Sequence, residues 1–418
     1  MTRKTIGKAA YTVLEKLDDA GYEAFLVGGS VRDILLGRQP KDFDVATNAH
    51  PEEVKELFRR CRLVGRRFRL AHVRVGRDII EVATFRAASN DPHMAVANER
   101  INTDAGAQTM VVSEGGQLIR DNIYGDIHQD IWRRDFTVNA LYYDFSDGSI
   151  WDFGGGMHDI RAKVLRVIGD PEKRLREDPV RMLRAARFAA KLNFDIAPDT
   201  ERAILANASR LDSISPARLF DELMKLFHHG YAIFSHRKLV ELELFAHLIP
   251  IAEPFIKNGS VYEKLWLKAL ASTDSRIERH KSVTPAFLLA VVLWGPMRAL
   301  ADEMVAEGVP PIEALNRAAG NAMQEMRKRI SVPRRFSLGV RDITTMQPRF
   351  DRRIGRRAMR LLEHPRFRAA YDFLCLRAEV GDAEQELVDW WTKIQNLPRH
   401  EQVKMTRPPR RQKKKNNS

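Results

Sequence analysis

The sequence predicts an α+β (α/β) head built on a small mixed sheet, followed by an all-helical neck and body. Two patterns carry this prediction. Strand-like and helical spacings of apolar residues alternate through roughly residue 150, whereas helical spacing interrupted by prolines dominates from Glu172 onward. The length of 418 residues and a hydrophobic content of 44% allow a large core, which excludes a disordered chain and a small disulfide-stapled domain.

The head is expected to alternate short strands with short helices. Apolar runs bounded by turn residues predict strands over Ala24–Val27, Asp42–Thr47, Leu70–Val75 and Asp78–Phe85, with a hairpin near Gly76 between the last two. Helical spacing predicts helices over residues 5–20, Ser30–Leu36 (with Ser30 as N-cap and Gly37 as the stop) and Pro51–Arg60. Residues 87–117 are polar and predict a long mobile loop.

Composition shifts along the chain predict five segments. They are an N-terminal helix (1–22), the head (23–150), a helical neck (151–230), a helical body (231–405) and a disordered basic tail (406–418).

Cysteine use and apolar patterning indicate where the protein works. Only Cys61 and Cys375 occur, which favours a reducing compartment without structural disulfides or a cysteine metal site. The N-terminus is charged without an apolar core, and the longest apolar stretch, Ala286–Pro296, is too short to span a bilayer. We therefore expect a soluble, cytoplasmic protein.

The charge is strongly basic and unevenly spread. There are 69 Lys and Arg residues against 55 Asp and Glu, a net charge of +14, and the last twelve residues (RPPRRQKKKNNS) contain no acid. A polyanion is the expected partner, because basic tracts neutralise backbone phosphates. Composition alone does not distinguish RNA from DNA, and a solubilising tail is the alternative interpretation.

A glycine turn followed by two carboxylates is the first candidate site. Asp42 and Asp44 are two apart, so on a strand they would share a face about 7 Å apart, a spacing suited to a pair of divalent cations. Gly28, Gly29 and Ser30 can bring backbone N–H groups against a triphosphate at a helix start. Alone, each motif is equally an ordinary turn or an exposed strand; together they favour nucleotidyl transfer. Arg32 can add positive charge nearby.

Several segments in order resemble one superfamily. The turn GGSVRDILLG followed by KDFDVAT resembles the signature of the nucleotidyltransferases that include class II tRNA CCA-adding enzymes and bacterial poly(A) polymerases. The later matching segments are RRDFTVNALYYD (Arg133–Asp144), WDFGGGMHDIRAKVLRVIG (Trp151–Gly169), REDPVRMLRAARFAAKLNF (Arg176–Phe194) and SPARLFDELMKLF (Ser215–Phe227). The resemblance covers residues 20–230 and implies a nucleotidyltransferase head.

Within the superfamily, the segment LVGRRFRLAHV (Leu63–Val73) and the arginine-rich second half resemble the bacterial poly(A) polymerases. That resemblance implies addition of AMP from ATP to the 3′ ends of mRNA and other RNAs without a template, in RNA processing and decay. A CCA-adding enzyme is the alternative activity. A non-catalytic RNA-binding protein on the same scaffold is the second alternative.

The resemblance also implies roles for the first group of candidate residues. Asp42 and Asp44 would ligate two Mg²⁺ ions. Glu81, on the polar face of its strand, and Asp135 are both candidates for a third carboxylate, and an N-cap for the following segment is the alternative for Asp135. Arg133 and Arg134 are flexible cations suited to contact with triphosphate or RNA phosphate, and ordinary surface arginines are the alternative.

Nucleotide selection is expected on the segment from Asp178 to Arg187. Asp178 and Arg181 are three apart and would share a helix face, where the resemblance implies that they pair with the Watson–Crick edge of the incoming base. A surface ion pair is the alternative. Arg184 and Arg187 continue the same helix toward base or phosphate.

Two basic segments are candidate RNA contacts. One is a helical stripe formed by Arg352, Arg353, Arg356 and Arg357, and the other is the tail with Arg410, Arg411, Lys413, Lys414 and Lys415. A solvated helix face is the alternative for the stripe.

Other features predict no chemistry. His228 and His229 lack metal-ligand spacing, and Gly154–Gly156 predicts a turn and not a phosphate loop. Of Trp390 and Trp391, one should be buried and the other half-exposed.

Overall fold

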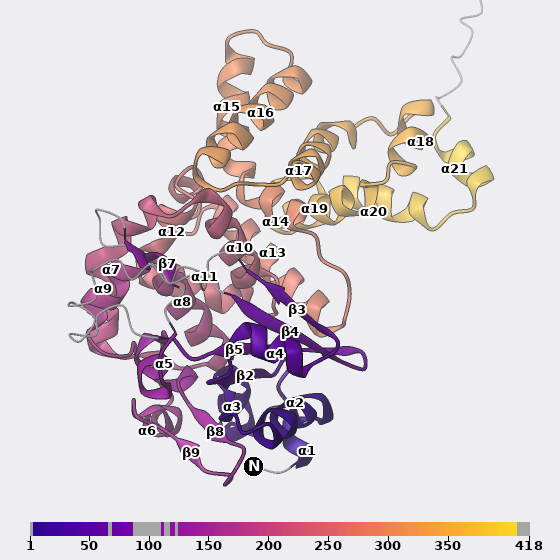
Figure 1. The fold of residues 1–418 in the computed structure, drawn as a ribbon. Coiled ribbons are helices and arrows are strands. Elements are labelled where there is room, and N and C mark those ends of the chain that lie inside the picture. Colours follow the sequence, from indigo (N-terminus) through magenta and orange to yellow (C-terminus); the bar gives the residue numbers. More distant parts are fainter. Residues whose placement is uncertain (1–2, 66–68, 87–109, 113–117, 122–123, 408–418) are drawn as a thin grey trace, which may run out of the picture. The chain divides into compact units, whose positions relative to one another are not determined.

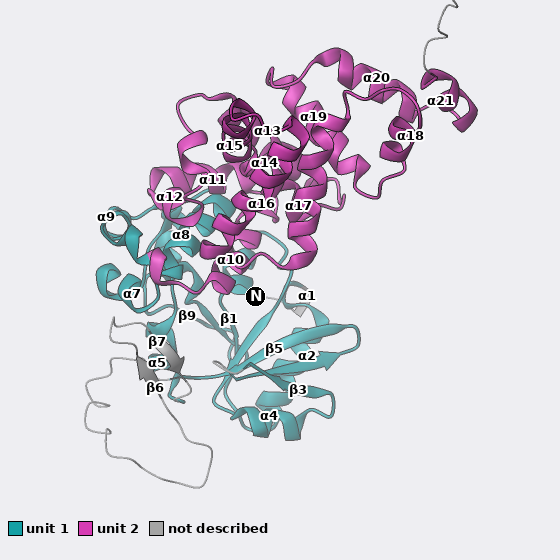
Figure 2. Ribbon diagram, turned by 90° about the horizontal axis from the view of Figure 1, so that it is seen from above, with its two compact units in different colours: residues 1–210 teal, residues 211–418 magenta. Residues whose placement is uncertain are grey.

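A computed structural model describes residues 3–65, 69–86, 110–112, 118–121 and 124–407 (Figure 1). The chain divides into two compact units, residues 1–210 and 211–418, which are coloured separately in Figure 2. The first unit contains the sheet and the second is helical, as predicted.

The first unit is built on a mixed seven-stranded sheet of order β3-β4-β5-β2-β1-β8-β9. Its strands are β1 (Ala24–Val27), β2 (Asp44–Thr47), β3 (Cys61–Val64), β4 (Leu70–Val75), β5 (Asp78–Thr84), β8 (Tyr142–Asp144) and β9 (Ile150–Trp151). The β2–β5 pair is parallel and the other neighbours are antiparallel. All four side chains of β1 are buried because this strand lies inside the sheet.

Short helices connect the strands of the head. They are α1 (Arg3–Ile6), α2 (Lys8–Asp19), α3 (Gly29–Leu35), α4 (Pro51–Leu57), α5 (Ile127–Arg133) and the 3₁₀ turn η2 (Thr137–Asn139). Helix α2 packs on β1, β2, β4 and β5. The helix expected over 5–20 is divided at Gly7, where φ is 78°.

The prediction that Ser30 caps its helix is wrong. The N-cap of α3 is Gly28, whose φ of 71° suits glycine, and no side chain caps this helix. The Ser30 hydroxyl instead donates to the carbonyl of Val27 at 3.0 Å. The turn conformation therefore moves the helix start toward the strand and leaves Ser30 inside the first turn.

The expected loop over 87–117 is interrupted. Met110–Val112 forms strand β6, which pairs antiparallel with β7 (Leu118–Asp121), so the prediction is wrong for these three residues. Residues 87–109 and 113–117 lie outside the described residues.

The segment after the sheet carries the remaining elements of the first unit. They are α6 (Gly156–Ala162), β10 (Val164–Leu165), α7 (Pro171–Glu177), α8 (Val180–Leu192), β11 (Asp195–Ile196) and α9 (Pro198–Asn207); the 3₁₀ segment η3 (Ala208–Ser213) follows. Strands β10 and β11 pair in parallel. The Phe136 and Phe188 rings lie 5.7 Å apart, so α8 packs against the segment that precedes η2.

The Gly154–Gly156 segment is a turn leading into α6, as expected. Asp152 accepts from the N–H groups of Gly156 (2.7 Å) and Met157 (2.8 Å), so its carboxylate occupies the start of that helix. A Cβ at Gly156 would lie 2.4 Å from the carbonyl oxygen of Thr137, which explains the glycine at this position.

Every secondary-structure element described in the second unit is an α-helix or a 3₁₀ turn. The helices are α10 (Pro216–Phe227), α11 (Ala232–Glu241), α12 (Leu244–Leu248), α13 (Val261–Glu278), α14 (Pro285–Val292), α15 (Trp294–Ala306), α16 (Pro311–Arg329), α17 (Arg334–Met346), α18 (Arg356–Leu362), α19 (Phe367–Glu379), α20 (Gln385–Gln395) and α21 (Arg399–Met405), with turns η4 (Glu253–Phe255) and η5 (Gln347–Arg349). Prolines at the first helical position start several of them.

The core of the second unit confirms the prediction that one of the two adjacent tryptophans is buried and the other only partly buried. Trp391 is completely buried and its indole N–H donates to the carbonyl of Phe350 at 2.9 Å, whereas Trp390 is partly buried. His228 is largely buried, which lowers its pKa to about 4, so this imidazole is neutral at pH 7.

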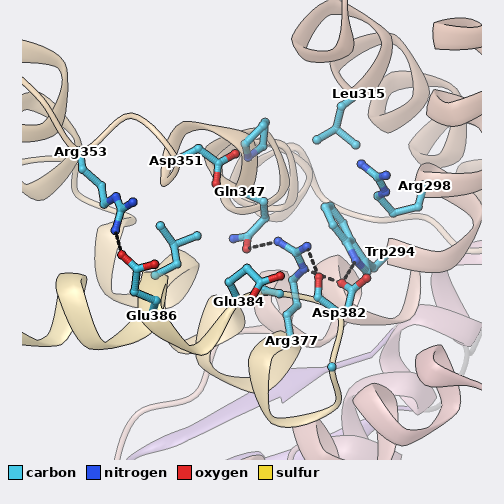
Figure 3. A pocket seen from close by; sticks show the side chains of 14 residues that line it. Trp294, Arg298, Leu315, Gln347, Asp351, Arg353, Arg377, Asp382, Glu384 and Glu386 are labelled. Carbon is cyan, nitrogen blue, oxygen red and sulfur yellow. Dashed lines mark hydrogen bonds and ion pairs between the residues drawn. The ribbon is translucent and has the colours of Figure 1, made fainter.

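One cavity of about 460 Å³ lies within the second unit (Figure 3). Among the residues that line it, Arg377 donates to Asp382 (2.6 Å) and Gln347 (3.1 Å), and the Trp294 indole N–H donates to the same Asp382 carboxylate (2.8 Å). The buried charge is therefore compensated within the cavity wall.

In the described parts of the chain, no single helix is long and apolar enough to cross a membrane. Helices α14 and α15 reach that length and composition only as a pair bent by 50°.

Candidate active site

The site begins where β1 ends in the Gly28–Gly29 turn. The N–H of Gly28 donates to the carbonyl of Leu141 at 3.1 Å, which fixes the turn to the segment before β8. A Cβ at Gly28 would lie 3.4 Å from Nη1 of Arg134, so glycine leaves this approach open to the arginine.

A pair of carboxylates lies at neighbouring positions of β2 and β5. Asp44 is the first residue of β2 and pairs in parallel register with Glu81 of β5, and both side chains are exposed. The alternation of β5 puts Glu81 on the exposed face, as predicted, and the parallel register brings it beside Asp44. Asp42 is exposed and precedes β2, so the strand predicted to begin at Asp42 begins two residues later, and the charge of Asp42 still acts on Asp44.

The electrostatics of Asp44 reflect this crowding. Although solvent reaches the side chain, partial desolvation and the nearby negative charges of Glu81 and Asp42 raise the pKa of Asp44 to about 6. A set of carboxylate oxygens that repel one another suits a hard divalent cation. Among the described residues, no three His, Cys, Asp or Glu side chains are already gathered as a complete metal site.

Asp135 has different neighbours. It forms an ion pair with Arg184 (2.5 Å) and accepts from the Asn139 side chain (3.1 Å) and the Phe136 N–H (2.8 Å). Burial alone would raise its pKa, but Arg184 and these hydrogen bonds lower the pKa of Asp135 to about 2. The N-cap alternative is wrong, because η2 begins after Phe136 without a side-chain cap. Of the two candidates, Glu81 is the one beside Asp44, on the neighbouring strand.

Arg32 is inside the protein. Its side chain is almost fully buried and donates to Asp33 (2.6 Å and 2.8 Å) and to Asn139. One guanidinium nitrogen, Nη2, lies 3.4 Å from the position that a Cβ of Gly29 would occupy, so Arg32 packs against the turn from inside the protein. Direct contact with a phosphate would require this network to open.

Arg134 approaches the turn from α5 with its other nitrogens occupied. Nε donates to the Tyr142 hydroxyl at 2.5 Å and Nη2 donates to Asp130 at 3.1 Å. Sequence reasoning missed Asp130 and Tyr142. The i,i+4 spacing of Asp130 and Arg134 was an available signal for one of the two contacts, whereas Tyr142 comes from strand β8.

The predicted base-reading pair is not on one helix. Asp178 lies between α7 and α8 with extended φ and ψ of −143° and 92°, so the shared-face prediction is wrong. Pro179 follows it, and a residue before proline disfavours helical geometry. Arg181 donates to the carbonyl of Arg174 (2.6 Å) and contacts Glu177 (3.3 Å), which places it against the end of α7.

Arg174 is a further residue that the sequence did not single out. Its Nη2 donates to the carbonyls of Arg133 and Arg134, both at 2.7 Å, and its Nη1 pairs with Glu177. Burial lowers the pKa of Arg174 to about 10, so the guanidinium is still charged at pH 7. Helix α7 is thereby tied to the end of α5.

Arginines also gather around the Phe188 ring of α8. The guanidinium carbons of Arg187, Arg184 and Arg32 lie 4.4, 5.3 and 5.4 Å from the ring centroid. Arg184 and Arg187 therefore lie on α8 as predicted, with Arg184 directed at Asp135.

The candidate RNA residues lie in the second unit. Arg356 and Arg357 are the first residues of α18, but Arg352 and Arg353 precede Gly355, whose φ is 76°, so the prediction of one helical stripe is wrong. Arg353 pairs with Glu386 at 2.7 Å beside the cavity (Figure 3), and the other three are exposed. The tail residues Arg410, Arg411, Lys413, Lys414 and Lys415 lie outside the described residues.

Comparisons with known proteins agree with this architecture. Residues 24–166 match the family model described as "Poly A polymerase head domain", residues 193–256 "Probable RNA and SrmB-binding site of polymerase A", and residues 307–418 "Polymerase A arginine-rich C-terminus". Poly(A) polymerase I of Escherichia coli O157:H7 is 48% identical over 400 residues, which are 94% of this chain and 84% of that protein. The chain belongs to the bacterial poly(A) polymerase family.

Other relatives place this poly(A) polymerase family member among related enzymes. Poly(A) polymerase I of Haemophilus influenzae is 44% identical over 94% of this chain and 85% of that protein. The CCA-adding enzyme of Geobacillus stearothermophilus is 36% identical over 62% of this chain and 59% of that protein.

Solved structures confirm the fold class predicted for this poly(A) polymerase family member. A CCA-adding enzyme in apo form has a TM-score of 0.65 at 22% identity, covering 95% of this chain and 84% of that one. The Thermotoga maritima CCA-adding enzyme complexed with tRNA has a TM-score of 0.58 at 21% identity, covering 92% and 80%.

Proposed function

We propose that this chain adds AMP from ATP to RNA 3′ ends without a template and releases pyrophosphate. The observation that carries the proposal is the contrast between relatives. Those named poly(A) polymerase I are 44–48% identical over 94% of the chain, whereas those named CCA-adding enzyme are 36–39% identical over 52–62%. The substrates are expected to be the ends of mRNA and other RNAs in the cytoplasm.

Asp42, Asp44 and Glu81 are the proposed metal ligands. Their support is the parallel register of Asp44 with Glu81 and the raised pKa of Asp44, which a bound cation would reverse. When bound, a pair of Mg²⁺ ions would activate the RNA 3′-hydroxyl and neutralise charge on the leaving pyrophosphate. The carboxylates themselves orient the attacking end of the primer beside the start of β2. Asp135 is proposed to hold Arg184 in place.

The Gly28–Gly29 turn and Arg134 are the proposed triphosphate site. The turn presents backbone close to the arginine: a Cβ at Gly28 would stand in van der Waals contact with Nη1, and the φ of 71° favours glycine there. Ser30 supports the turn through Val27, and Arg133 lies next to Arg134 at the end of α5.

Adenine selection is proposed for Asp178 and Arg181. Arg184 and Arg187, further along α8, are proposed to assist them in binding the nucleotide. The support is that Arg181 is held by Arg174 and Glu177 in one orientation. A rigid donor–acceptor set selects one base because a wrong base leaves buried polar groups unpaired.

RNA is proposed to lie on Arg352, Arg353, Arg356 and Arg357 and on the basic tail. Three of these arginines are exposed, and Arg353 is partly neutralised by Glu386. Exposed arginines at a helix start suit phosphate contacts, whose strength falls with salt.

A nucleotide-choice assay tests the proposed activity. A generic RNA primer is incubated with Mg²⁺ and one nucleoside triphosphate at a time, and product length and pyrophosphate release are measured, with Asp44→Asn as the control for contaminating activity. Long tails from ATP alone are expected. Addition of only one or two residues from CTP alone, with no tail from ATP alone, would indicate a CCA-adding enzyme. Absence of pyrophosphate release with every nucleotide would indicate a non-catalytic RNA-binding protein.

A further inference from the structure

We propose that Asp130 and Tyr142 are positioning residues that hold the Arg134 guanidinium at the Gly28 turn, so that it meets the ATP triphosphate already oriented. The inference rests on the proposed function, because it concerns the same triphosphate site. Neither residue is expected to touch the nucleotide; both act through Arg134.

The three side chains form a closed hydrogen-bonded triangle. The carboxylate oxygen Oδ2 of Asp130 accepts from the Tyr142 hydroxyl at 2.5 Å and from Nη2 of Arg134 at 3.1 Å. The Tyr142 hydroxyl in turn accepts from Nε of Arg134 at 2.5 Å. The other oxygen, Oδ1 of Asp130, accepts from the backbone N–H of Arg86 at 3.2 Å, which fixes the carboxylate itself.

Burial makes this triangle rigid and keeps it charged. Tyr142 is fully buried, Asp130 is 6% exposed and the side chain of Arg134 is 23% exposed. Burial alone would raise the pKa of Asp130, but the charges of Arg134 and Arg133 and the Tyr142 hydrogen bond bring it below its usual range. The guanidinium also lies over the Tyr142 ring, 4.7 Å from its centroid.

The remaining nitrogen, Nη1, is the one directed at the turn. It lies 3.4 Å from the Cβ position of Gly28, and no partner for it is found among the residues described here. The backbone of Arg134 is held as well, because Arg174 donates to its carbonyl at 2.7 Å. Side chain and backbone are therefore both fixed before a ligand arrives, which reduces the entropy lost when an arginine orders on a phosphate.

Two substitutions separate positioning from packing. Tyr142→Phe keeps the ring in the core and removes only the hydroxyl. Asp130→Asn keeps an oxygen for the Arg86 N–H and places an amide nitrogen, which cannot accept, where Oδ2 now accepts from Arg134 and Tyr142. Tyr143→Phe is the matched control, because it removes a hydroxyl from the next residue of β8, and among the described residues no hydrogen bond joins that hydroxyl to Arg134.

The experiment measures KM and kcat for ATP, KM for the RNA primer, and inhibition by pyrophosphate and by adenosine, with thermal unfolding as a fold check. In both variants we expect the KM for ATP and the inhibition constant of pyrophosphate to rise about fivefold, the effect of ordering one arginine on binding. The kcat, the primer KM and inhibition by adenosine, which lacks phosphates, should stay within twofold, and Tyr143→Phe should resemble the unaltered chain.

Two results would overturn the proposal. One is an unchanged ATP KM and pyrophosphate inhibition in Tyr142→Phe, the milder variant that preserves the core. The other is a parallel rise for ATP, primer and adenosine together with early unfolding, which indicates a packing role only. Failure of the unaltered chain to use ATP while binding pyrophosphate would contradict the proposed function instead, and calorimetric titration of pyrophosphate into the variants would still test the positioning.

Discussion

Replacing Asp44 by Asn is expected to stabilise the fold while it removes activity. The carboxylate has a pKa raised from 3.8 to about 6, so its ionised form is disfavoured in the folded protein. At 1.36 kcal/mol per pKa unit the shift corresponds to about 3 kcal/mol at pH 7. Because the side chain is exposed and water screens its neighbours, we expect about 1 kcal/mol to be recovered by Asn.

The pH dependence follows from the raised pKa. The folded state takes up a proton near pH 6 and the unfolded state near pH 4, so the unaltered chain gains stability as pH falls through this window. The Asn variant has no such carboxyl. Its stability advantage should therefore be full above about pH 7 and disappear below about pH 4.

Thermal unfolding in EDTA provides the measurement. For a folding unit of about 200 residues, 1 kcal/mol corresponds to a Tm increase of about 2–4 °C. Asp78→Asn is the matched control, because Asp78 is an exposed carboxylate at the start of β5. An equal or lower Tm for Asp44→Asn at pH 7.5, or an advantage that widens at low pH, would refute the reasoning. Added Mg²⁺ should stabilise the unaltered chain more than the variant.

The remaining predictions concern catalysis, RNA and the core. Asp42→Ala should abolish adenylate transfer while filter binding of RNA persists; full activity would contradict its proposed role as a metal ligand. Deleting residues 407–418 should weaken RNA binding and flatten the slope of log K against log salt without changing the KM for ATP, and an unchanged slope would exclude the tail as an RNA arm. Arg184→Met should destabilise the fold by about 3 kcal/mol, because it leaves the buried Asp135 charge without its partner. Adding Asp135→Asn to Arg184→Met should restore most of that loss in chemical denaturation, and a purely additive double variant would contradict the coupling.

Local rules in the sequence placed many elements correctly. Ala24–Val27 forms a buried strand that is followed by the Gly28 turn, because a short apolar run before two glycines is typical of a buried strand that ends in a tight turn. Alternation also put Glu81 on the polar face of its strand. The errors at Asp178 and at Arg352–Arg353 come from backbone breaks that were present in the sequence, a following proline and a nearby glycine.

Contacts between distant segments were beyond those rules. That Glu81 stands beside Asp44 depends on the parallel register of two strands, and nothing local specifies this register. The same holds for Tyr142 beneath Arg134 and for Arg184 at Asp135, where a buried charge finds its partner 49 residues away.

The sequence by itself determined the order of elements, the family and the residue types of the site, because periodicity, glycine and proline act over a few neighbours. The tertiary structure alone decided which of these residues form ion pairs and hydrogen bonds with one another. Buried charges must be paired when the chain folds, and the partners come from whichever strands and helices the topology brings together. Arg32 and Asp135 are thereby held inside the protein, while Arg134 keeps one nitrogen directed at the Gly28 turn.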